Sequence, residues 1–499
     1  MDEKQIERLV NRYGFQLIET HISWVLIGDE LVYKIKKPVD FGFLDYTTLE
    51  KRKHFCQEEI RLNRRLAEEI YIGVSRIVSS DGELLIDEDG ELVDYAVKMK
   101  RMPQDRMMNL LIENNTIKDE EVDALARKVA EFHKRADTNE YISSFGSVEV
   151  NKTNTDENFV QTKDAVGEYI TRFEYESIKR YTDAFYRKYS QLFDERISSG
   201  RIRECHGDMY SRNVCIVDAA HIYIYDCIEF NERFRYSDVA SDVAFMLMDL
   251  ENYQRWDLSE LFLKRYLEYS QDDTLLDVLD FYKVYRAYVR GKIAYFQQNV
   301  KEANAYFDLA FGYLEDSYKP KLVMLCGLTG AGKSYIAQRL KEAIGAVVLS
   351  SDVIRKQLAG MNPEDRDLSE FGKGIYTPEI TQRVYQELAE RAYALLRDGK
   401  NVILDATFLK NEYRRAVEFR LKRLGIKPLI VLVDIDDEKA LEHFKKRKEY
   451  GGVSDGRYEI YLKQKELFER PTNCIVVDGS DDADTNLRMI LRALSSPVT

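Results

Sequence analysis

The sequence is poor in the features that mark secreted, membrane and metal-stapled proteins. Its 499 residues include six cysteines and six histidines, scattered without a C-x-x-C pair or ligand spacing, so we expect neither a disulfide framework nor a zinc site. No apolar run approaches the length of a membrane span. The first residues lack a basic stretch followed by an apolar one, so we expect no signal peptide. These absences favour a cytoplasmic protein.

A basic excess is also missing. The net charge is −13, and the one dense basic run, Lys445–Lys448, is explained by a solvated helix face. We therefore expect no strong basic track for nucleic acid. The chain is too long for a single core, which predicts two or three domains. Nothing in the pattern sets the oligomeric state.

The most informative segment is a complete phosphate-loop motif, G-x-x-x-x-G-K-S. It consists of Gly327, Leu328, Thr329, Gly330, Ala331, Gly332, Lys333 and Ser334. An apolar strand pattern precedes it and a helical pattern follows it, as this motif requires. Its backbone N–H groups bind phosphate, Lys333 reaches the β/γ-phosphates, and the Ser334 hydroxyl binds Mg²⁺. The sequence therefore predicts a site for ATP (or GTP) with Mg²⁺.

The residues around this motif predict a parallel sheet. Apolar strand patterns alternate with helical ones, at 321–326, 345–350, 401–405, 428–434 and 473–478. Such a βαβ series predicts an α/β fold with helices on both faces and ligands at the carboxyl ends of the strands.

Three further residues are candidates at that edge of the sheet. Asp405 ends the third strand, where a carboxylate is expected to hold Mg²⁺ through water. Asp352 and Arg355 share one face of the helix start that follows the second strand. We predict that Asp352 takes the proton of the acceptor, while Arg355 binds a phosphate or carboxylate of the acceptor.

A second nucleotide site is predicted in the first half of the chain. Residues 206–213 have the spacing H-x-D-x-x-x-x-N of a kinase catalytic loop, and Asp226 ends an apolar strand thirteen residues later. In this order Asp208 is the catalytic base, and Asn213 with Asp226 holds Mg²⁺ against the triphosphate. His206 is expected to brace the loop.

The residues upstream supply the expected partners for the phosphates. Lys34 and Lys36 point to the same face of one strand, and one of them should contact the α/β-phosphates. Lys34 is our choice. Glu59, on the following helix, is placed to pair with it, and Glu58 is the alternative.

A possible supporting carboxylate lies further along the chain. Asp242 is on a predicted helix that begins near Asp238. We interpret Asp242 as a structural carboxylate that bonds the catalytic loop, with a ligand role as the alternative.

Residues 1 to about 315 resemble the aminoglycoside phosphotransferase family, a branch of the protein-kinase-like fold. The resemblance is carried by His206-Gly-Asp208, Asn213, Asp226-Cys-Ile-Glu229 and Ala130-Glu-Phe-His133. It implies ATP-dependent phosphorylation of a small-molecule hydroxyl. There is no G-x-G-x-x-G loop, no A-P-E segment, and no Gly two residues after Asp226. These differences argue against a protein kinase proper and fit the small-molecule branch.

The C-terminal part resembles P-loop kinases of the polynucleotide-kinase and gluconate-kinase type, including zeta-toxin relatives. The matching residues are the phosphate loop, Asp352, Arg355 and Leu404-Asp-Ala-Thr407. The resemblance implies an arginine-bearing lid, for which Arg447 is our first choice and Arg457 the second. The fusion of the two parts is similar to a bacterial family described as bifunctional aminoglycoside phosphotransferase and ATP-binding protein.

Together these observations predict an α+β, kinase-like, two-lobed N-terminal domain followed by an α/β P-loop NTPase domain with a parallel sheet. The predicted domains are 1–317, with a small lobe to about 102 and a helical large lobe from about 103, and 320–499. The predicted function is transfer of a γ-phosphate to two acceptors. The first is a small molecule; the second is a small molecule or a nucleic-acid 5′-hydroxyl. The alternatives are an ATP-binding switch protein, or a toxin-like P-loop kinase restrained by the N-terminal domain.

Overall fold

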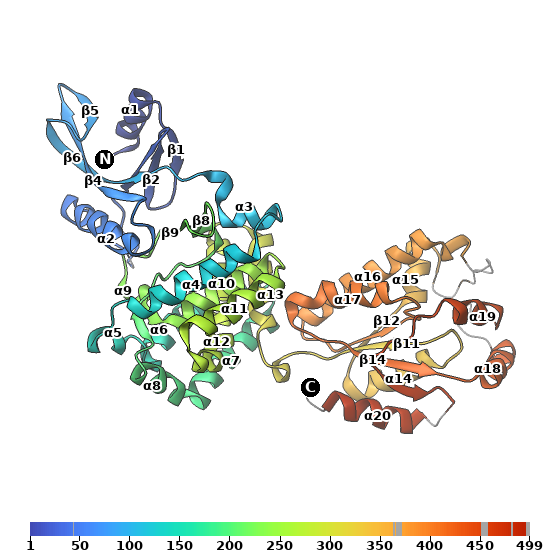
Figure 1. The fold of residues 1–499 in the computed structure, drawn as a ribbon. Helices are drawn as coiled ribbons and strands as arrows, with labels where there is room; N and C mark the ends of the chain where they lie inside the picture. Colours follow the sequence, from blue (N-terminus) through green and yellow to red (C-terminus); the bar gives the residue numbers. More distant parts are fainter. Residues whose placement is uncertain (43, 363–364, 366–371, 451–457, 481–482, 496–499) are drawn as a thin grey trace. The chain divides into compact units, whose positions relative to one another are not determined.

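The computed structural model of the protein describes all residues except 43, 363–364, 366–371, 451–457, 481–482 and 496–499. At residues 443, 446–450, 483 and 495 only the backbone is described. The chain forms two compact units: Met1–Gln161 with Thr182–Lys292, and Thr162–Tyr181 with Ile293–Thr499 (Figure 1). The predicted domains, 1–317 and 320–499, follow the sequence motifs and differ in their boundaries from these two units. They stay a prediction.

The first unit begins with a six-stranded antiparallel sheet. In sheet order its strands are β1 (Gln16–Glu19), β2 (Ser23–Ile27), β3 (Leu31–Lys36), β6 (Glu91–Lys100), β4 (Tyr71–Ser80) and β5 (Glu83–Ile86). A hairpin turn at Gly28-Asp29 joins β2 to β3, and the Gly28 N–H donates to the Leu31 carbonyl at 2.8 Å. This hairpin places Lys34 and Lys36 in the middle of the sheet.

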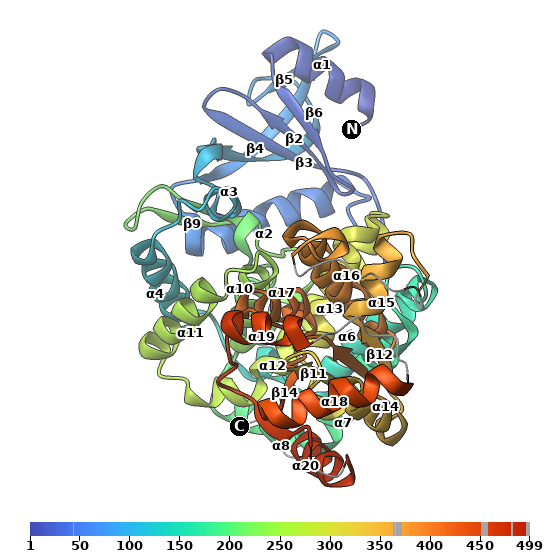
Figure 2. The same cartoon turned by 90° about the vertical axis from the view of Figure 1, so that its right-hand side faces the viewer.

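Two helices, α1 (Glu3–Tyr13) and α2 (Leu49–Ala67), pack on this sheet (Figure 2). Ile6 of α1 shares a core with Ala96, and Cys56 of α2 shares another with Val97. Because Ala96 and Val97 are neighbours in β6, their side chains point to opposite faces of the sheet. The Thr48 side chain caps helix α2 by accepting the Lys51 N–H. This cap fixes the start of the helix that carries Glu59.

The rest of the first unit is mainly helical. Its helices include α3 (Met108–Glu113), α4 (Asp119–Arg135), α5 (Glu140–Ser144), α6 (Val148–Gln161), α8 (Ser190–Ser198), α9 (Glu232–Arg235), α10 (Val239–Asn252) and α11 (Trp256–Ser270). Helices α7 (Arg172–Lys188) and α12 (Leu276–Phe296) run from one unit into the other. Two short antiparallel pairs, β7 (Ile202–Glu204) with β10 (Tyr236–Asp238) and β8 (Val214–Ile216) with β9 (Ile222–Ile224), flank the predicted catalytic loop.

The second unit contains the predicted parallel sheet, five-stranded among the described residues. In sheet order its strands are β12 (Val347–Ser350), β13 (Val402–Asp405), β11 (Leu322–Cys326), β14 (Leu429–Asp434) and β15 (Ile475–Asp478). The strand order reverses at β11, so the phosphate loop that follows β11 lies at the switch point where such sheets bind ligands.

Helices cover both faces of this sheet. Helices α15 (Ser351–Leu358), α16 (Pro378–Arg397) and α17 (Asn411–Leu421) lie on one face, and α14 (Lys333–Ile344) and α20 (Ala483–Ser495) on the other (Figure 1). Helices α18 (Asp437–Tyr450) and α19 (Tyr458–Leu467) follow β14. None of the helices that the structure describes is both long and apolar enough to cross a bilayer.

Two segments from the middle of the chain also pack in the second unit. Arg397 of α16 forms ion pairs with Glu174, at the start of α7, and with Asp308 of α13 (Val300–Gly312), at 2.9 and 2.7 Å. All three side chains are largely buried. Buried ion pairs therefore join the P-loop part to helices that precede it in the sequence.

Candidate active sites

The first candidate site brings together residues that lie far apart in the sequence. Lys34 Nζ lies 2.6 Å from Asp226 Oδ1 and 3.0 Å from Glu59 Oε1. Burial alone would lower the pKa of Lys34, but these two carboxylates raise it well above its usual value. The Asp226 side chain remains 45% exposed, so this cluster opens to solvent at its acidic end. The predicted partner Glu59 is in place.

Lys36, the alternative to Lys34, is fully buried. Its Nζ lies 2.7 Å from Glu59 Oε2 and also pairs with Glu229, which accepts a hydrogen bond from Tyr46. Glu58, the alternative to Glu59, pairs instead with Arg61 on its own helix. The two lysines therefore differ in access: Lys34 faces Asp226, and Lys36 is closed off inside the small lobe. Glu229 stands in the D-C-I-E segment, but the sequence assigned it no role.

Asp208 and Asn213, the predicted base and metal ligand, lie in direct contact. Asn213 Nδ2 donates to both the carboxylate and the backbone carbonyl of Asp208 at 2.9 Å. Burial, assisted by the negative charge of Asp226, raises the pKa of Asp208 to about 6. A carboxyl with this pKa is suited to accept a proton near neutral pH.

His206 braces the loop as predicted. Its Nε2 lies 3.0 Å from the Tyr225 carbonyl, and its Nδ1 accepts the Asp208 N–H at 3.3 Å. Burial lowers the pKa of His206 to about 4, so the ring stays neutral at neutral pH.

Asp242 supports the same loop from α10, in the structural role that we preferred. Its carboxylate accepts the N–H groups of His206 and Gly207 at 2.8 and 2.9 Å. These bonds fix the backbone immediately before Asp208.

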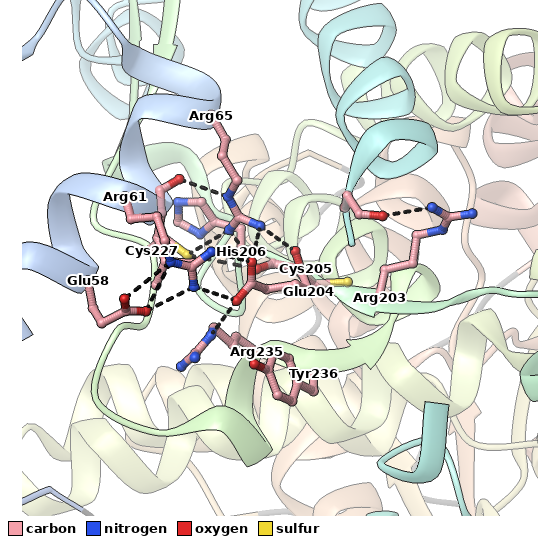
Figure 3. Close-up of polar contacts among 12 residues, drawn as sticks. Glu58, Arg61, Arg65, Arg203, Glu204, Cys205, His206, Cys227, Arg235 and Tyr236 are labelled. Atoms are coloured by element: carbon pink, nitrogen blue, oxygen red, sulfur yellow. Dashed lines mark hydrogen bonds and ion pairs between the residues drawn. The ribbon is translucent and has the colours of Figure 1, made fainter. Parts of the chain in front are cut away.

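A cluster of arginines around Glu204 borders the catalytic segment (Figure 3). Arg61 and Arg65 come from α2 and Arg235 from α9. Sequence reasoning missed this cluster, because Arg61 and Arg65 pair with Glu204 across more than 130 residues and surface arginines on a helix normally need no explanation.

One group with metal-ligand chemistry stands out among the described residues: His133, Cys205 and Asp242, all buried. Its atoms already have partners in the fold. Cys205 Sγ donates to the Ser237 carbonyl, and Asp242 holds the catalytic loop. Burial also raises the pKa of the Cys205 thiol well above its usual value, which disfavours the thiolate that a metal requires. We interpret the group as a hydrogen-bonded core.

The second candidate site is the phosphate loop between β11 and α14. Gly332 has φ 94° and forms the N-cap of α14, whose first residue is Lys333. Gly327 has φ 137°, and a Cβ there would lie 2.3 Å from the Val433 carbonyl oxygen. Lys333 Nζ folds back onto the Leu328 carbonyl at 2.8 Å. The loop thus has the backbone that an anion site at a helix N-terminus needs.

Asp405 lies beside this loop. It ends β13 in register with Leu325 of β11, and the Gly327 N–H donates to the Thr407 carbonyl at 3.2 Å. Its exposed fraction is 7%. The carboxylate is therefore at the strand end where the metal was predicted.

Asp352 and Arg355 lie at the start of α15, as predicted. Arg355 is buried: Nη1 donates to the Ile375 carbonyl and to Thr381 at 3.0 Å, and the guanidinium lies 4.8 Å from the Tyr376 ring centre. Its Nε has no hydrogen-bond partner among the described residues. A buried donor of this kind is costly unless a further group occupies the site.

Helix α19 also contacts the phosphate loop, which sequence reasoning did not predict. Gln464 Oε1 accepts the Thr329 N–H at 3.0 Å. A cavity of about 530 Å³ opens beside the loop, lined among others by Leu328, Asp437, Tyr461 and Lys465. This volume lies in the usual range for small-ligand sites. Of the predicted lid residues, the Arg447 side chain and all of Arg457 lie outside the described residues.

Comparison with known proteins gives matches of two kinds. A family model described as "AAA domain" matches residues 322–471. Adenylate kinase of Micrococcus luteus is 24% identical over 189 residues, 35% of this chain and 90% of that protein. The C-terminal part is an α/β P-loop kinase-like domain with a parallel sheet.

Solved structures resemble the chain only weakly. The APS kinase CysC of Mycobacterium tuberculosis, in complex with AMPPNP and APS, is 20% identical and covers 36% of this chain and 99% of its own, with a TM-score of 0.29. A gluconokinase from Sinorhizobium meliloti is 19% identical and covers 35% and 92%, with a TM-score of 0.27. Likenesses of this size carry no argument about activity.

A longer match extends well beyond the P-loop part. The uncharacterized protein Rv2004c of Mycobacterium tuberculosis is 31% identical over 396 residues, 78% of each chain. The uncharacterized protein Mb2027c of Mycobacterium bovis matches to the same extent. The chain therefore belongs to the same family as these mycobacterial proteins.

Proposed function

We propose that this protein is an ATP-dependent phosphotransferase with two nucleotide sites, each of which moves a γ-phosphoryl group to a hydroxyl. The observation that carries the proposal is the convergence of Lys34, Glu59 and Asp226 in one unit, in a chain whose other unit has a complete phosphate loop. Each site offers a lysine for phosphate and a carboxylate for a metal. Phosphoryl transfer depends mainly on such positioning and charge neutralisation.

At the N-terminal site, we assign the antiparallel sheet and the helical part to the two lobes of a kinase-like domain. Lys34 holds the α/β-phosphates, in place of its present contact with Asp226. Asp208 accepts the proton of the attacking hydroxyl, which its raised pKa permits near neutral pH. Asn213 keeps Asp208 in position through the hydrogen bond from Nδ2.

The residues present also fit Mg²⁺. Since Asn213 Nδ2 donates to Asp208, its amide oxygen is left to face a cation, and the half-exposed Asp226 carboxylate supplies a second oxygen. At the other site Ser334 and Asp405 supply the oxygens. Oxygen ligands of this kind suit Mg²⁺, which would neutralise charge on the phosphates when bound.

At the C-terminal site, the loop N–H groups and Lys333 hold the β/γ-phosphates. Asp352, at the start of α15, takes the proton of the acceptor. The orphaned Nε of Arg355 is directed to an anionic group of that acceptor. Arg447 of α18 is proposed as the lid arginine. The adenylate kinase relatives support ATP as the donor.

The acceptors are proposed by class. The N-terminal site takes a small-molecule hydroxyl, and the C-terminal site takes a small molecule or a nucleic-acid 5′-hydroxyl. A screen of labelled γ-phosphate transfer against sugars, nucleosides, aminoglycosides and 5′-hydroxyl oligonucleotides, run with each single-site variant, assigns an acceptor to its site.

The proposal is tested first by counting nucleotides. Titration with a non-hydrolysable ATP analogue and Mg²⁺ should give two sites per chain. Lys333→Ala should remove one site and Asp226→Ala the other. The matched controls are Lys341→Ala on the same helix as Lys333, and Asp218→Ala, an exposed carboxylate. A stoichiometry that neither site variant changes contradicts the proposal.

A further inference from the structure

Helix α2 is attached to the catalytic segment as well as to the sheet. Glu204 ends β7, two residues before His206, and its side chain is 3% exposed. Figure 3 shows the side chains of Arg61, Arg65 and Arg235 converging on it. The carboxylate, which β7 carries, is thus the common partner of two helices.

The contacts are direct and short. Arg61 donates to both carboxylate oxygens of Glu204, at 2.7 and 2.9 Å. Arg65 donates to the Glu204 backbone carbonyl at 2.7 Å and to its carboxylate at 3.1 Å. Arg235 Nε lies 3.3 Å from the carboxylate. Forked contacts of guanidinium with carboxylate fix orientation as well as distance.

The charges in this cluster balance only while Glu204 is ionised. Three guanidinium groups surround the buried Glu204 carboxylate, and two further carboxylates complete the balance: Glu58 pairs with Arg61, and Glu232 lies 3.8 Å from Arg235. Burial alone would raise the pKa of Glu204, but the arginines, led by Arg61, lower it below its usual value. Without this negative charge the guanidinium groups would repel one another in a poorly solvated space. The attachment of α2 therefore depends on the Glu204 carboxylate.

Further contacts connect the same helix to the segments that carry the predicted active-site residues. Asn63 Oδ1 accepts the Cys227 N–H at 2.9 Å, directly after Asp226. Arg65 Nη2 donates to the Cys205 carbonyl at 3.3 Å, directly before His206. These contacts occur on the helix turns next to Glu59, so a shift of α2 would move Glu59 relative to Asp226.

We propose that the Glu204 cluster is a positioning device that holds α2 against the catalytic segment, so that Glu59 keeps Lys34 in place for phosphate before any ligand binds. This inference rests on the proposed function of the N-terminal site. Glu204, Arg61 and Arg65 are positioning residues, because they act through Glu59 and the loop and not on the nucleotide.

The test is acceptor-independent turnover of γ-labelled ATP by the full-length chain in a Lys333→Ala background, which isolates the N-terminal site. Glu204→Gln should lower kcat at least tenfold and raise the KM for ATP, because a displaced Glu59 no longer keeps Lys34 in place for the phosphates. Glu204→Gln leaves one cation in excess, and removing a cation in Glu204→Gln/Arg61→Gln should restore part of kcat. A purely structural role predicts the opposite result, in which the double variant has a lower kcat than either single variant.

The matched control is Arg64→Met, on the same helix. Arg64 donates to the Tyr71 and Ile72 carbonyls within the small lobe and makes no contact with Glu204 among the described residues. It should keep kcat within twofold even if it lowers stability. Should Glu204→Gln fail to fold, Arg61→Met tests the same contact, since that side chain is 44% exposed.

Wild-type kcat in a folded Glu204→Gln or Arg61→Met variant overturns the positioning role. Absence of both ATP binding and turnover in the Lys333→Ala chain itself is a different result. It refutes the proposed function of the N-terminal site and this inference with it.

Discussion

The structure makes its sharpest prediction at Asp242, the buried carboxylate under the catalytic loop. Asp242→Asn keeps the size of the side chain but leaves one acceptor oxygen for two backbone N–H groups, those of His206 and Gly207. One buried N–H is then unpaired, which costs about 1–3 kcal/mol. Loss of the charge that faces His133 at 3.4 Å adds about 1 kcal/mol, so we expect a loss of about 2–4 kcal/mol.

The pH dependence of stability should also show that the Asp242 carboxylate stabilises the fold. Burial alone would raise the pKa of Asp242, but hydrogen bonding from His133 and nearby positive charge lower it to about 2, from an ordinary value of 3.8. A carboxyl with a lowered pKa stabilises the fold fully above its unfolded pKa. That contribution is lost as pH falls through about 4 towards 2, and it amounts to about 2 kcal/mol.

The assay uses the tryptophans. The chain has two, Trp24 and Trp256, and both lie in the first unit. Tryptophan fluorescence during urea unfolding therefore reports this unit alone. With a slope of about 2–3 kcal/mol per molar urea, the Asp242→Asn midpoint should fall by about 1 M or more.

Asp249→Asn is the matched control on the same helix. Asp249 accepts a single backbone N–H, from Ser211 at 2.9 Å, and burial raises its pKa. An amide oxygen can keep that one bond, so the expected loss is below about 1 kcal/mol. Equal midpoints for the two variants would refute the reasoning, because the second N–H of Asp242 would then contribute nothing.

Three further predictions follow from the two sites. Turnover at the N-terminal site should fall below about pH 6, because the raised pKa of Asp208 leaves the base protonated there; a flat profile from pH 5 to 7 contradicts this role. Lys36→Met should destabilise the first unit by about 3–5 kcal/mol in urea unfolding, because the buried Glu229 carboxylate loses its lysine and Glu59 keeps only Lys34. Lys34→Met should mainly abolish ATP binding at the N-terminal site. If Lys36→Met abolished ATP binding and Lys34→Met lowered stability instead, the two lysines would have the opposite roles. Gly327→Ala should abolish nucleotide binding at the phosphate loop, because the added Cβ overlaps a β14 carbonyl. Gly345→Ala, with φ 60° and open space around it, should retain binding. Equal nucleotide titrations for the two variants would contradict the steric argument.

The elements that the sequence predicted well are those determined by local pattern. The five parallel strands lie within a residue or two of their expected positions, because apolar periodicity is a local signal. The phosphate loop was predictable for the same reason, since its glycines and Lys333 lie within one short segment. The roles of individual site residues stay predictions.

Residues whose role depends on distant partners were not predictable. Lys34 and Lys36 share a strand face, and only their distant partners distinguish them: Tyr46 and Glu229 close around Lys36, whereas Asp226 faces Lys34. Gln464 contacts a loop residue 135 positions away. A side chain of this kind carries no sequence signal before the fold is known.

In the proposed N-terminal site, the part of helix α2 that carries Glu59 is held in position before a ligand binds. Glu59, in the middle of α2, is fixed by two lysines, and the next turns of the helix are fixed by the contacts of Arg61 with Glu204 and of Asn63 with Cys227. These contacts leave this part of the helix little freedom to shift. For Lys34 to bind phosphate, its ion pair with Asp226 must break. Nucleotide affinity at this site should therefore depend on Mg²⁺, because a cation that takes over the Asp226 carboxylate releases Lys34 for the phosphates. Titration with the ATP analogue in the presence of a chelator should show weaker binding at this site. Unchanged affinity would mean that Lys34 is not the group released.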